Sequence, residues 1–173
     1  VTAGEHPRPG PDRPGDVTMP IHLSSTFALE GIDTDVDLET LDPGANEYVY
    51  SRLNNPTRHA LEERLAALED AAHGLAFASG TAAIATTVLA IVEPGDHVVA
   101  FDDLYGGTNQ MFKRLFEARL DVDVTFVDAT DTDTVAAAVT DETALVWMET
   151  PTNPLLKLCD VEAIAAVADD HDA

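Results

Sequence analysis

Several short segments of this chain place glycine, hydroxyl, aromatic and amide groups where a bound ligand could use them. In residues 78–83 (ASGTAA), small residues follow an apolar run and open a stretch of helical character. The backbone N–H groups of Gly80 and Thr81 would then point out of a helix N-terminus, an arrangement that binds phosphate. The alternative is an ordinary capped helix that packs closely through alanine and glycine.

Two further segments carry a tyrosine and an asparagine that could meet a flat ligand. In residues 102–108 (DDLYGGT), Tyr105 stands next to two glycines, and its ring could lie over such a ligand. In residues 149–154 (ETPTNP), two prolines brace a loop and aim the amide of Asn153, which could hydrogen-bond a ring oxygen. Alternatively, Tyr105 is a packing residue and Asn153 a solvated side chain in a rigid turn.

A further segment, residues 48–57 (YVYSRLNNPT), holds Tyr50 and Arg52. A guanidinium group can grip a phosphate with two parallel N–H bonds, and this chain has few cations for that purpose. The alternative is that Arg52 neutralises nearby acidic residues on the surface. No GxGxxG or GxxxxGK[ST] pattern occurs, which disfavours a dinucleotide fold or a P-loop. An unrelated α/β nucleotide-binding domain is the remaining alternative of that kind.

The elements that must position these residues follow from the spacing of apolar side chains. Leucines at helical spacing predict an amphipathic helix that starts at Pro56, with Thr57 as its N-cap and Gly74 at its end. Beyond it we predict strands 75–78, 97–101, 122–127 and 144–148, and helices 80–91, 106–119, 132–139 and 161–169. Continuous apolar strands separated by helices indicate an α/β fold with a mostly parallel sheet covered on both faces. In such sheets ligands bind at the carboxyl ends of the strands.

The N-terminal part of the chain has a different character. Residues 1–20 are rich in proline and glycine, and residues 21–58 scatter apolar side chains without a clear period. We therefore predict an extended, irregular N-terminal arm over residues 1–58, which is stable only against another surface such as a second subunit. Residues 59–173 would form the first part of the α/β domain.

Taken together, these segments resemble one family, the Cys/Met-metabolism enzymes that depend on pyridoxal 5′-phosphate (PLP), and within it the trans-sulfuration group. The stretches that carry the resemblance are SSTF at 24–27, EYVYSRLNNPTRHALEERLAALE at 47–69, AFASGTAAI at 76–84, FDDLYGGTNQMFKR at 101–114 and LVWMETPTNP at 145–154. They run in order over nearly the whole chain, and YSRxxNPT together with ETPTNP is highly specific. The resemblance implies the large domain of a fold-type-I PLP-dependent transferase, incomplete here.

The resemblance also implies roles for individual residues. Gly80 and Thr81 would donate backbone N–H groups to the PLP phosphate. Tyr105 would stack on the pyridine ring and, as the one catalytic residue assigned, assist proton transfer. Asn153 would lie near the ring oxygen O3′.

The same resemblance implies partners and a reaction. Tyr50 and Arg52 would reach the phosphate held by a neighbouring subunit, in a homotetramer built as a dimer of dimers. The substrate would be a small amino acid, and the segment DDLYGGTN favours γ-elimination on cystathionine, as in cystathionine γ-lyases. The alternative is γ-replacement, by a cystathionine γ-synthase or an O-acetylhomoserine sulfhydrylase. The methionine γ-lyase group often has Cys where Gly107 stands here, which counts against that activity.

Lysine is scarce in the chain. Lys113 and Lys157 are the only lysines in 173 residues, and neither lies where a PLP-binding lysine is expected. We therefore expect the chain to be the N-terminal part of a longer enzyme and to be inactive by itself. A non-catalytic oligomerisation module, which lends Tyr50 and Arg52 to an intact partner, is the alternative of another class.

The charge of the chain is strongly negative. The formal net charge is −23, from 32 acidic and 9 basic residues, with 45% of residues hydrophobic. Such a surface suits high salt, where screening removes the self-repulsion, so we expect a halophile. Nucleic acid is disfavoured as a partner because its phosphates would be repelled, and no run of about 18 apolar residues predicts a membrane span. The single Cys159 suits a reducing cytoplasm, and no metal site is predicted.

Overall fold

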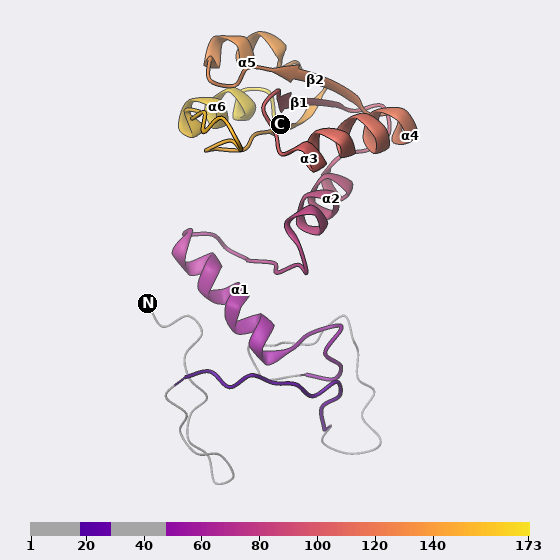
Figure 1. Ribbon diagram of the computed structural model, residues 1–173, viewed down its shortest axis with the longest axis vertical. Coiled ribbons are helices and arrows are strands. Elements are labelled where there is room, and N and C mark those ends of the chain that lie inside the picture. Colours follow the sequence, from indigo (N-terminus) through magenta and orange to yellow (C-terminus); the bar gives the residue numbers. More distant parts are fainter. Residues whose placement is uncertain (1–17, 29–47) are drawn as a thin grey trace. The chain divides into compact units, whose positions relative to one another are not determined.

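The structure is a computed structural model that describes residues 18–28 and 48–173. The chain divides into two units, Val1–Ala76 and Phe77–Ala173. Helix α1 (Pro56–Leu68) belongs to the first unit, and the sheet with its helices belongs to the second (Figure 1). Most of the predicted arm, residues 1–17 and 29–47, lies outside the described residues.

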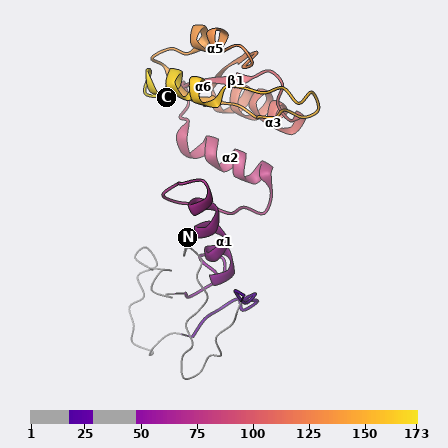
Figure 2. The same ribbon diagram turned by 90° about the vertical axis from the view of Figure 1, so that its left-hand side faces the viewer.

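The second unit is an α/β structure with a parallel sheet, as predicted. Its elements in chain order are α2 (Gly80–Ile91), β1 (His97–Phe101), α3 (Gly106–Met111), η2 (Phe112–Glu117), α4 (Ala118–Leu120), β2 (Asp123–Val127), α5 (Thr132–Ala138), β3 (Thr143–Trp147) and α6 (Val161–Asp169). The described strands form one sheet in the order β2-β1-β3, and both pairings are parallel. Val98 of β1 is in register with Val124 on one side and Leu145 on the other. The two views in Figures 1 and 2 show α5 and α6 next to this sheet.

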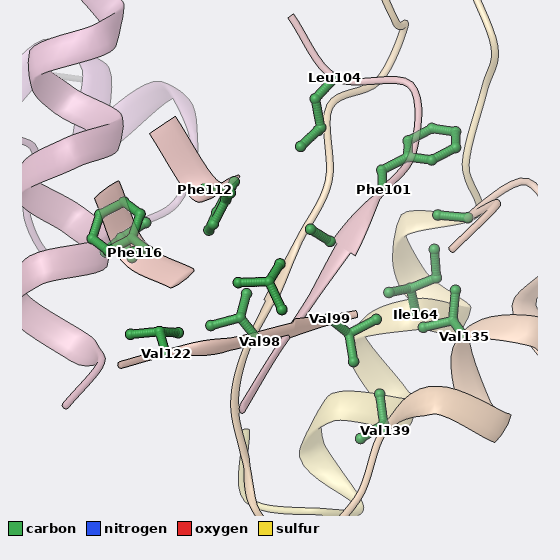
Figure 3. Close-up of a cluster of buried hydrophobic side chains, with 14 residues drawn as sticks. Val98, Val99, Phe101, Leu104, Phe112, Phe116, Val122, Val135, Val139 and Ile164 are labelled. Carbon is green, nitrogen blue, oxygen red and sulfur yellow. The ribbon is translucent and has the colours of Figure 1, made fainter. Parts of the chain in front are cut away.

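The central strand β1 is covered on both faces. Successive side chains of a strand point to opposite sides of the sheet. In Figure 3, Val98 lies toward Phe116 of η2, whereas Val99 lies toward Val135 of α5 and Ile164 of α6. All of these side chains are buried. This double burial explains why β1 reads as a continuous apolar run and not as an alternating one.

Most of the elements begin and end at or near their predicted residues. Helices α2 and α6 and strand β1 have the predicted bounds; β2 starts one residue later than predicted, and β3 both starts and ends one residue earlier. In the second unit, side chains cap three of the helices at their N-termini: Ser79 caps α2, Asp131 caps α5 and Asp160 caps α6. Each accepts a backbone N–H that has no partner inside the helix, which is why these residue types mark helix starts.

The strand predicted at residues 75–78 is wrong. A strand requires a neighbour that supplies ladder hydrogen bonds, and no described residue pairs with this segment. Leu75 is 78% exposed. Ala76 instead donates its N–H to Oε1 of Glu62 on α1 (2.9 Å). An apolar run is therefore not sufficient to make a strand here.

Helix α1 starts at Pro56 as predicted, but its predicted N-cap and its predicted C-terminal end are wrong. Asn55 caps the helix in place of Thr57, because Asn55 Oδ1 accepts the N–H of Thr57 at 2.9 Å. Pro56 then takes the first helical position, where a backbone N–H is not needed. The helix ends well before Gly74. A Cβ at Gly74 would lie 2.5 Å from the carbonyl oxygen of Glu62, so this glycine permits a close approach to α1.

The predicted helix over 106–119 has the right span but not a regular form. Its middle, η2, is a π-helix between the α-helical turns α3 and α4. A π turn is wider than an α turn, and here the rings of Phe112 and Phe116 lie side by side with centroids 5.6 Å apart. None of the helices in the described ranges is long and apolar enough to cross a membrane.

The Asn55 side chain also holds the described part of the N-terminal arm. Its Nδ2 donates to the carbonyl oxygen of His22 and to Oγ of Ser51, both at 3.1 Å. We expect Asn55→Ala to lower the free energy of unfolding by about 1–2 kcal/mol, through loss of the cap, and to speed proteolysis near His22. Asn55→Asp, which keeps the capping oxygen, should lose less. Urea unfolding followed by circular dichroism measures both, and equal losses for the two variants would contradict the capping role.

Candidate functional site

The loops that follow β1 and β3 are joined at the carboxyl edge of the sheet. Thr152, in the loop after β3, is 1% exposed. Its hydroxyl donates to Oδ2 of Asp103 in the loop after β1 (2.7 Å) and accepts the N–H of Lys157 (2.9 Å). The backbone N–H of Thr152 donates to the carbonyl oxygen of Lys157 at 3.1 Å. These bonds fix the position of the loop that carries Asn153.

Lys157 connects the ends of β1 and β2. Its Nζ lies 3.6 Å from Oδ1 of Asp102, which follows β1, and 3.7 Å from Oδ2 of Asp128, which follows β2. The same ammonium lies 5.4 Å from the centroid of the Phe101 ring. Hydrogen bonds from the hydroxyl and N–H of Thr130, and then the charge of Lys157, lower the pKa of Asp128 below its ordinary value. Asp128 therefore stays ionised at neutral pH, and its contribution to stability is lost only as the pH falls through that lowered pKa.

Tyr105 and Asn153 are both presented at this edge. Tyr105 is the N-cap residue of α3, and 52% of the residue is exposed. Asn153 is exposed next to the buried Thr152. The structure thus brings the two predicted residues onto a pair of loops that Thr152 and Asp103 tie together. In parallel sheets this edge is the usual place for a ligand.

Gly80 and Thr81 open helix α2, as predicted. Oγ of Ser79 accepts the N–H of Ala82 (3.2 Å), and the carbonyl of Ser79 accepts the N–H of Ala83 (3.0 Å). The N–H groups of Gly80 and Thr81 come before the first intrahelical bond and are exposed, so they remain available to an anion. Among the described residues, no hydrogen bond joins them to the loops of Tyr105 and Asn153.

Tyr50 and Arg52 lie together in the first unit. The guanidinium carbon of Arg52 is 4.9 Å from the centroid of the Tyr50 ring, a cation–π geometry. Tyr50 is held by an antiparallel bridge to Thr26, and Ser51 donates its N–H to the carbonyl of Ser25 (2.9 Å). The arm segment and the YSR segment therefore support each other locally, with Arg52 exposed.

Two functional candidates have no assigned role in the sequence analysis, namely Glu149 and Thr152. The carboxylate of Glu149 accepts the N–H of Tyr105 at 2.8 Å and the hydroxyl of Thr108 at 3.0 Å. Both residues belong to the ETPTNP segment. Their side-chain bonds to Tyr105, Thr108 and Asp103 each join residues more than 40 positions apart in the chain. No local pattern signals such bonds.

Cys159 lies in the loop after β3, between Lys157 and the start of α6. Partial burial is the main cause that raises the pKa of the Cys159 thiol above its ordinary value. The thiol is therefore protonated at neutral pH, which argues against a nucleophilic role. Within residues 18–28 and 48–173, no group of three or more His, Cys, Asp or Glu side chains is arranged to hold a metal ion.

The buried Thr152 hydroxyl should matter more for stability than an exposed one. We expect Thr152→Val to lower the free energy of unfolding by about 1–3 kcal/mol, because Asp103 and the Lys157 N–H lose a partner in a nearly isosteric replacement. Thr130→Val is the matched control: its exposed hydroxyl donates to Oδ1 of Asp128 at 2.7 Å, and its loss should stay within about 0.5 kcal/mol. Urea denaturation measures the free energy of unfolding of both variants. Equal losses would contradict the proposal that the Thr152 hydroxyl holds the two loops together.

The sequence of the chain matches one protein family. A sequence profile of the family described as Cys/Met metabolism PLP-dependent enzyme matches residues 1–173. The chain is 45% identical over 173 residues to cystathionine gamma-synthase of Mycobacterium tuberculosis, covering 100% of this chain and 41% of that protein. It is 46% identical over 153 residues to cystathionine gamma-lyase of Dictyostelium discoideum, covering 87% of this chain and 36% of that protein.

Solved structures agree with the sequence comparison. The chain is similar to the crystal structure of metB from Corynebacterium glutamicum, with a TM-score of 0.84 and 40% sequence identity. That match covers 99% of this chain and 41% of the other. The chain therefore spans less than half the length of the relatives that it matches.

Proposed function

The chain belongs to the family of Cys/Met metabolism PLP-dependent enzymes. We propose that it is part of a trans-sulfuration enzyme, which makes or breaks carbon–sulfur bonds. The proposed reaction is γ-elimination, in which cystathionine and water give cysteine, 2-oxobutanoate and ammonia. The observation that carries the proposal is the joined pair of loops after β1 and β3. They present Tyr105 and Asn153 at the carboxyl edge of a parallel sheet.

The donor groups of the chain fit PLP, a flat ring that carries an anionic phosphate. The exposed N–H groups at the start of α2 suit the phosphate, and at Gly80 nothing lies within 4 Å of the place that a Cβ would take. The exposed ring of Tyr105 suits the flat pyridine, and the amide of Asn153 suits the ring oxygen. When bound, PLP supplies an electron sink for the carbon from which the α-proton leaves.

The residues of the chain would bind and orient that ring. The N–H groups of Gly80 and Thr81 would donate to the phosphate, and the ring of Tyr105 would cover one face of the pyridine. The phenol of Tyr105 would hold a proton close to the substrate amine. The amide of Asn153 would fix the ring by its oxygen.

Tyr50 and Arg52 are proposed to act across a subunit boundary. Arg52 is exposed and already packed over Tyr50 at 4.9 Å, so the guanidinium is oriented before it meets a phosphate. In this proposal the pair completes the phosphate site of a neighbouring copy in a dimer of dimers. Mixing an Arg52→Ala variant of the full-length gene product with a Tyr105→Ala variant should restore part of the activity that each lacks. Activity in the mixture no higher than the sum of the two would refute the shared site.

A second candidate function is γ-replacement, in which cysteine displaces the leaving group of an activated homoserine to give cystathionine. The identity over the full chain to a cystathionine gamma-synthase, 45%, supports it as well as the identity to a gamma-lyase, 46%, supports elimination. Two assays on the full-length gene product with PLP separate them. Release of 2-oxobutanoate from cystathionine supports elimination, and formation of cystathionine from O-acetylhomoserine and cysteine supports replacement. Failure of both assays contradicts the proposed function.

Residues 1–173 by themselves are proposed to be inactive. Nζ of Lys113 lies 4.6 Å from the centroid of the Phe126 ring, and Nζ of Lys157 is paired with Asp102 and Asp128. Neither lysine stands in a segment where the family resemblance expects the lysine that attaches PLP. Product formation by this chain with PLP added would overturn this statement, and co-purification with an intact copy without activity would favour a non-catalytic module. We propose that the chain works in the cytoplasm of a salt-loving cell, because its 173 residues carry a net charge of −23 and a single cysteine, Cys159.

A further inference from the structure

The start of α3 is capped by a carboxylate from a distant loop. Oε2 of Glu149 accepts the N–H of Tyr105 at 2.8 Å, and Oε1 accepts the hydroxyl of Thr108 at 3.0 Å. Thr108 is 1% exposed and Glu149 is half-buried. A negative charge at a helix N-terminus is favourable, and hydrogen bonds to charged groups are stronger than neutral ones. The two bonds therefore set the position of the Tyr105 backbone.

The Tyr105 residue does not cap α3 with its own side chain. Its phenol ring is left free of the helix, and it lies back over Gly107. A Cβ built on Gly107 would lie 2.5 Å from Cε1 and 3.2 Å from Cδ1 of the ring. Any other residue at position 107 would have to displace the ring. The ring thus rests on bare backbone, while half of Tyr105 remains exposed.

We infer that Glu149 is a positioning residue for the Tyr105 ring. The carboxylate holds the Tyr105 backbone from one side and Gly107 receives the ring from the other, so the ring occupies its place before a ligand arrives. This inference rests on the proposed function, in which the Tyr105 ring covers PLP. Glu149 itself touches neither PLP nor substrate in this role; it acts through Tyr105 N–H and Thr108.

Glu149→Gln tests the inference in the full-length gene product. The amide oxygen can still accept the N–H of Tyr105 and the amide N–H₂ can donate to the Thr108 hydroxyl, so the variant chiefly removes the negative charge from both bonds and from the helix start. We expect the dissociation constant for PLP to rise about tenfold, as the loss of one charge-assisted bond predicts. The visible circular dichroism of bound PLP should weaken, because the ring beside it is less ordered. Both are measured by titrating the apoprotein with PLP.

Asp131→Asn provides a matched control at another helix start. Oδ1 of Asp131 accepts the N–H of Asp133 at 3.1 Å, and Oδ2 accepts the hydroxyl of Thr134 at 3.0 Å, so the same kind of bond pair loses its negative charge. This variant should lower the melting temperature to a similar extent and leave PLP affinity and dichroism unchanged. If the two variants change PLP binding equally, Glu149 is merely a structural cap and the inference is wrong.

A double-mutant cycle separates this inference from the proposed function. If Glu149 acts through the ring, Glu149→Gln should not weaken PLP binding further in a Tyr105→Ala background, whereas independent effects would multiply. Multiplicative effects overturn the inference and leave the role of Tyr105 intact. Unchanged PLP affinity in Tyr105→Ala overturns the role of Tyr105, and the inference with it. Should Glu149→Gln fail to fold, Glu149→Asp enters the same cycle, because its shorter side chain cannot reach both donors.

Discussion

Lowering the KCl concentration from about 1 M to about 0.1 M is expected to reduce the melting temperature of this chain by about 10 °C or more. The net charge is −23, with 32 acidic residues against 9 basic ones. The screening length grows from about 3 Å to about 10 Å over that range of salt, so neighbouring carboxylates begin to repel each other across the surface. Thermal unfolding followed by circular dichroism at several salt concentrations measures the effect.

The end of α6 offers variants that test the cause. Asp169, Asp170 and Asp172 are all exposed within a few residues of one another. Replacing all three by asparagine should flatten the salt dependence in proportion to the charge removed, with little change in stability at high salt. Sucrose stabilises compact states without screening charge. Sucrose added at low ionic strength should therefore not restore the melting temperature that is measured in high KCl. A melting temperature that is independent of salt would refute the high-salt adaptation.

The variant Phe112→Ala is expected to lower the free energy of unfolding by about 3–5 kcal/mol, as for other large aromatic residues removed from cores. Phe112 is 0% exposed. Its ring centroid lies 5.6 Å from that of Phe116 and 6.3 Å from that of Trp147, so one side chain joins η2 to β3. Because a domain is stable by only about 5–15 kcal/mol, this single loss should remove a large share of the total stability.

Trp147 provides the measurement for this variant. It is the only tryptophan of the chain, and its fluorescence should change as the cavity beside it opens. Phe112→Leu fills part of that cavity and should lose clearly less stability, while Phe126→Ala, at a partly buried position, should lose less than Phe112→Ala. If Phe126→Ala lowers the free energy of unfolding as much as Phe112→Ala does, Phe112 is not a more important core residue than Phe126, contrary to the buried cluster drawn in Figure 3.

The sequence predicted the elements whose signals are local. Helix α6 follows Asp160 and strand β1 is an unbroken apolar run, and both have the predicted bounds. The segment 75–78 has the same apolar character as a strand but no partner in the described residues, and partners are not a local property. The choice between Asn55 and Thr57 as the cap of α1 likewise depends on backbone geometry, because both residue types can cap a helix.

The candidate site was predictable in part for the same reason. Tyr105 and Asn153 could be assigned from their segments, since each follows a strand and the carboxyl ends of parallel strands share one edge. Glu149 and Thr152 could not, because their roles come from bonds to Tyr105 and Asp103 across the sheet. Whether Gly80 and Tyr50 meet the same ligand as Tyr105 stays a prediction for the assembled protein.

The order β2-β1-β3 has a consequence for synthesis on the ribosome. Of the strands in the described sheet, β1 leaves the exit tunnel first and is the middle one, and β2 and β3 then add to its two sides in turn. No strand in the described sheet has to be inserted between two that are already bonded. Vectorial assembly can thus proceed outward without a rearrangement step, and β1 is shielded from other nascent chains as soon as its neighbours arrive.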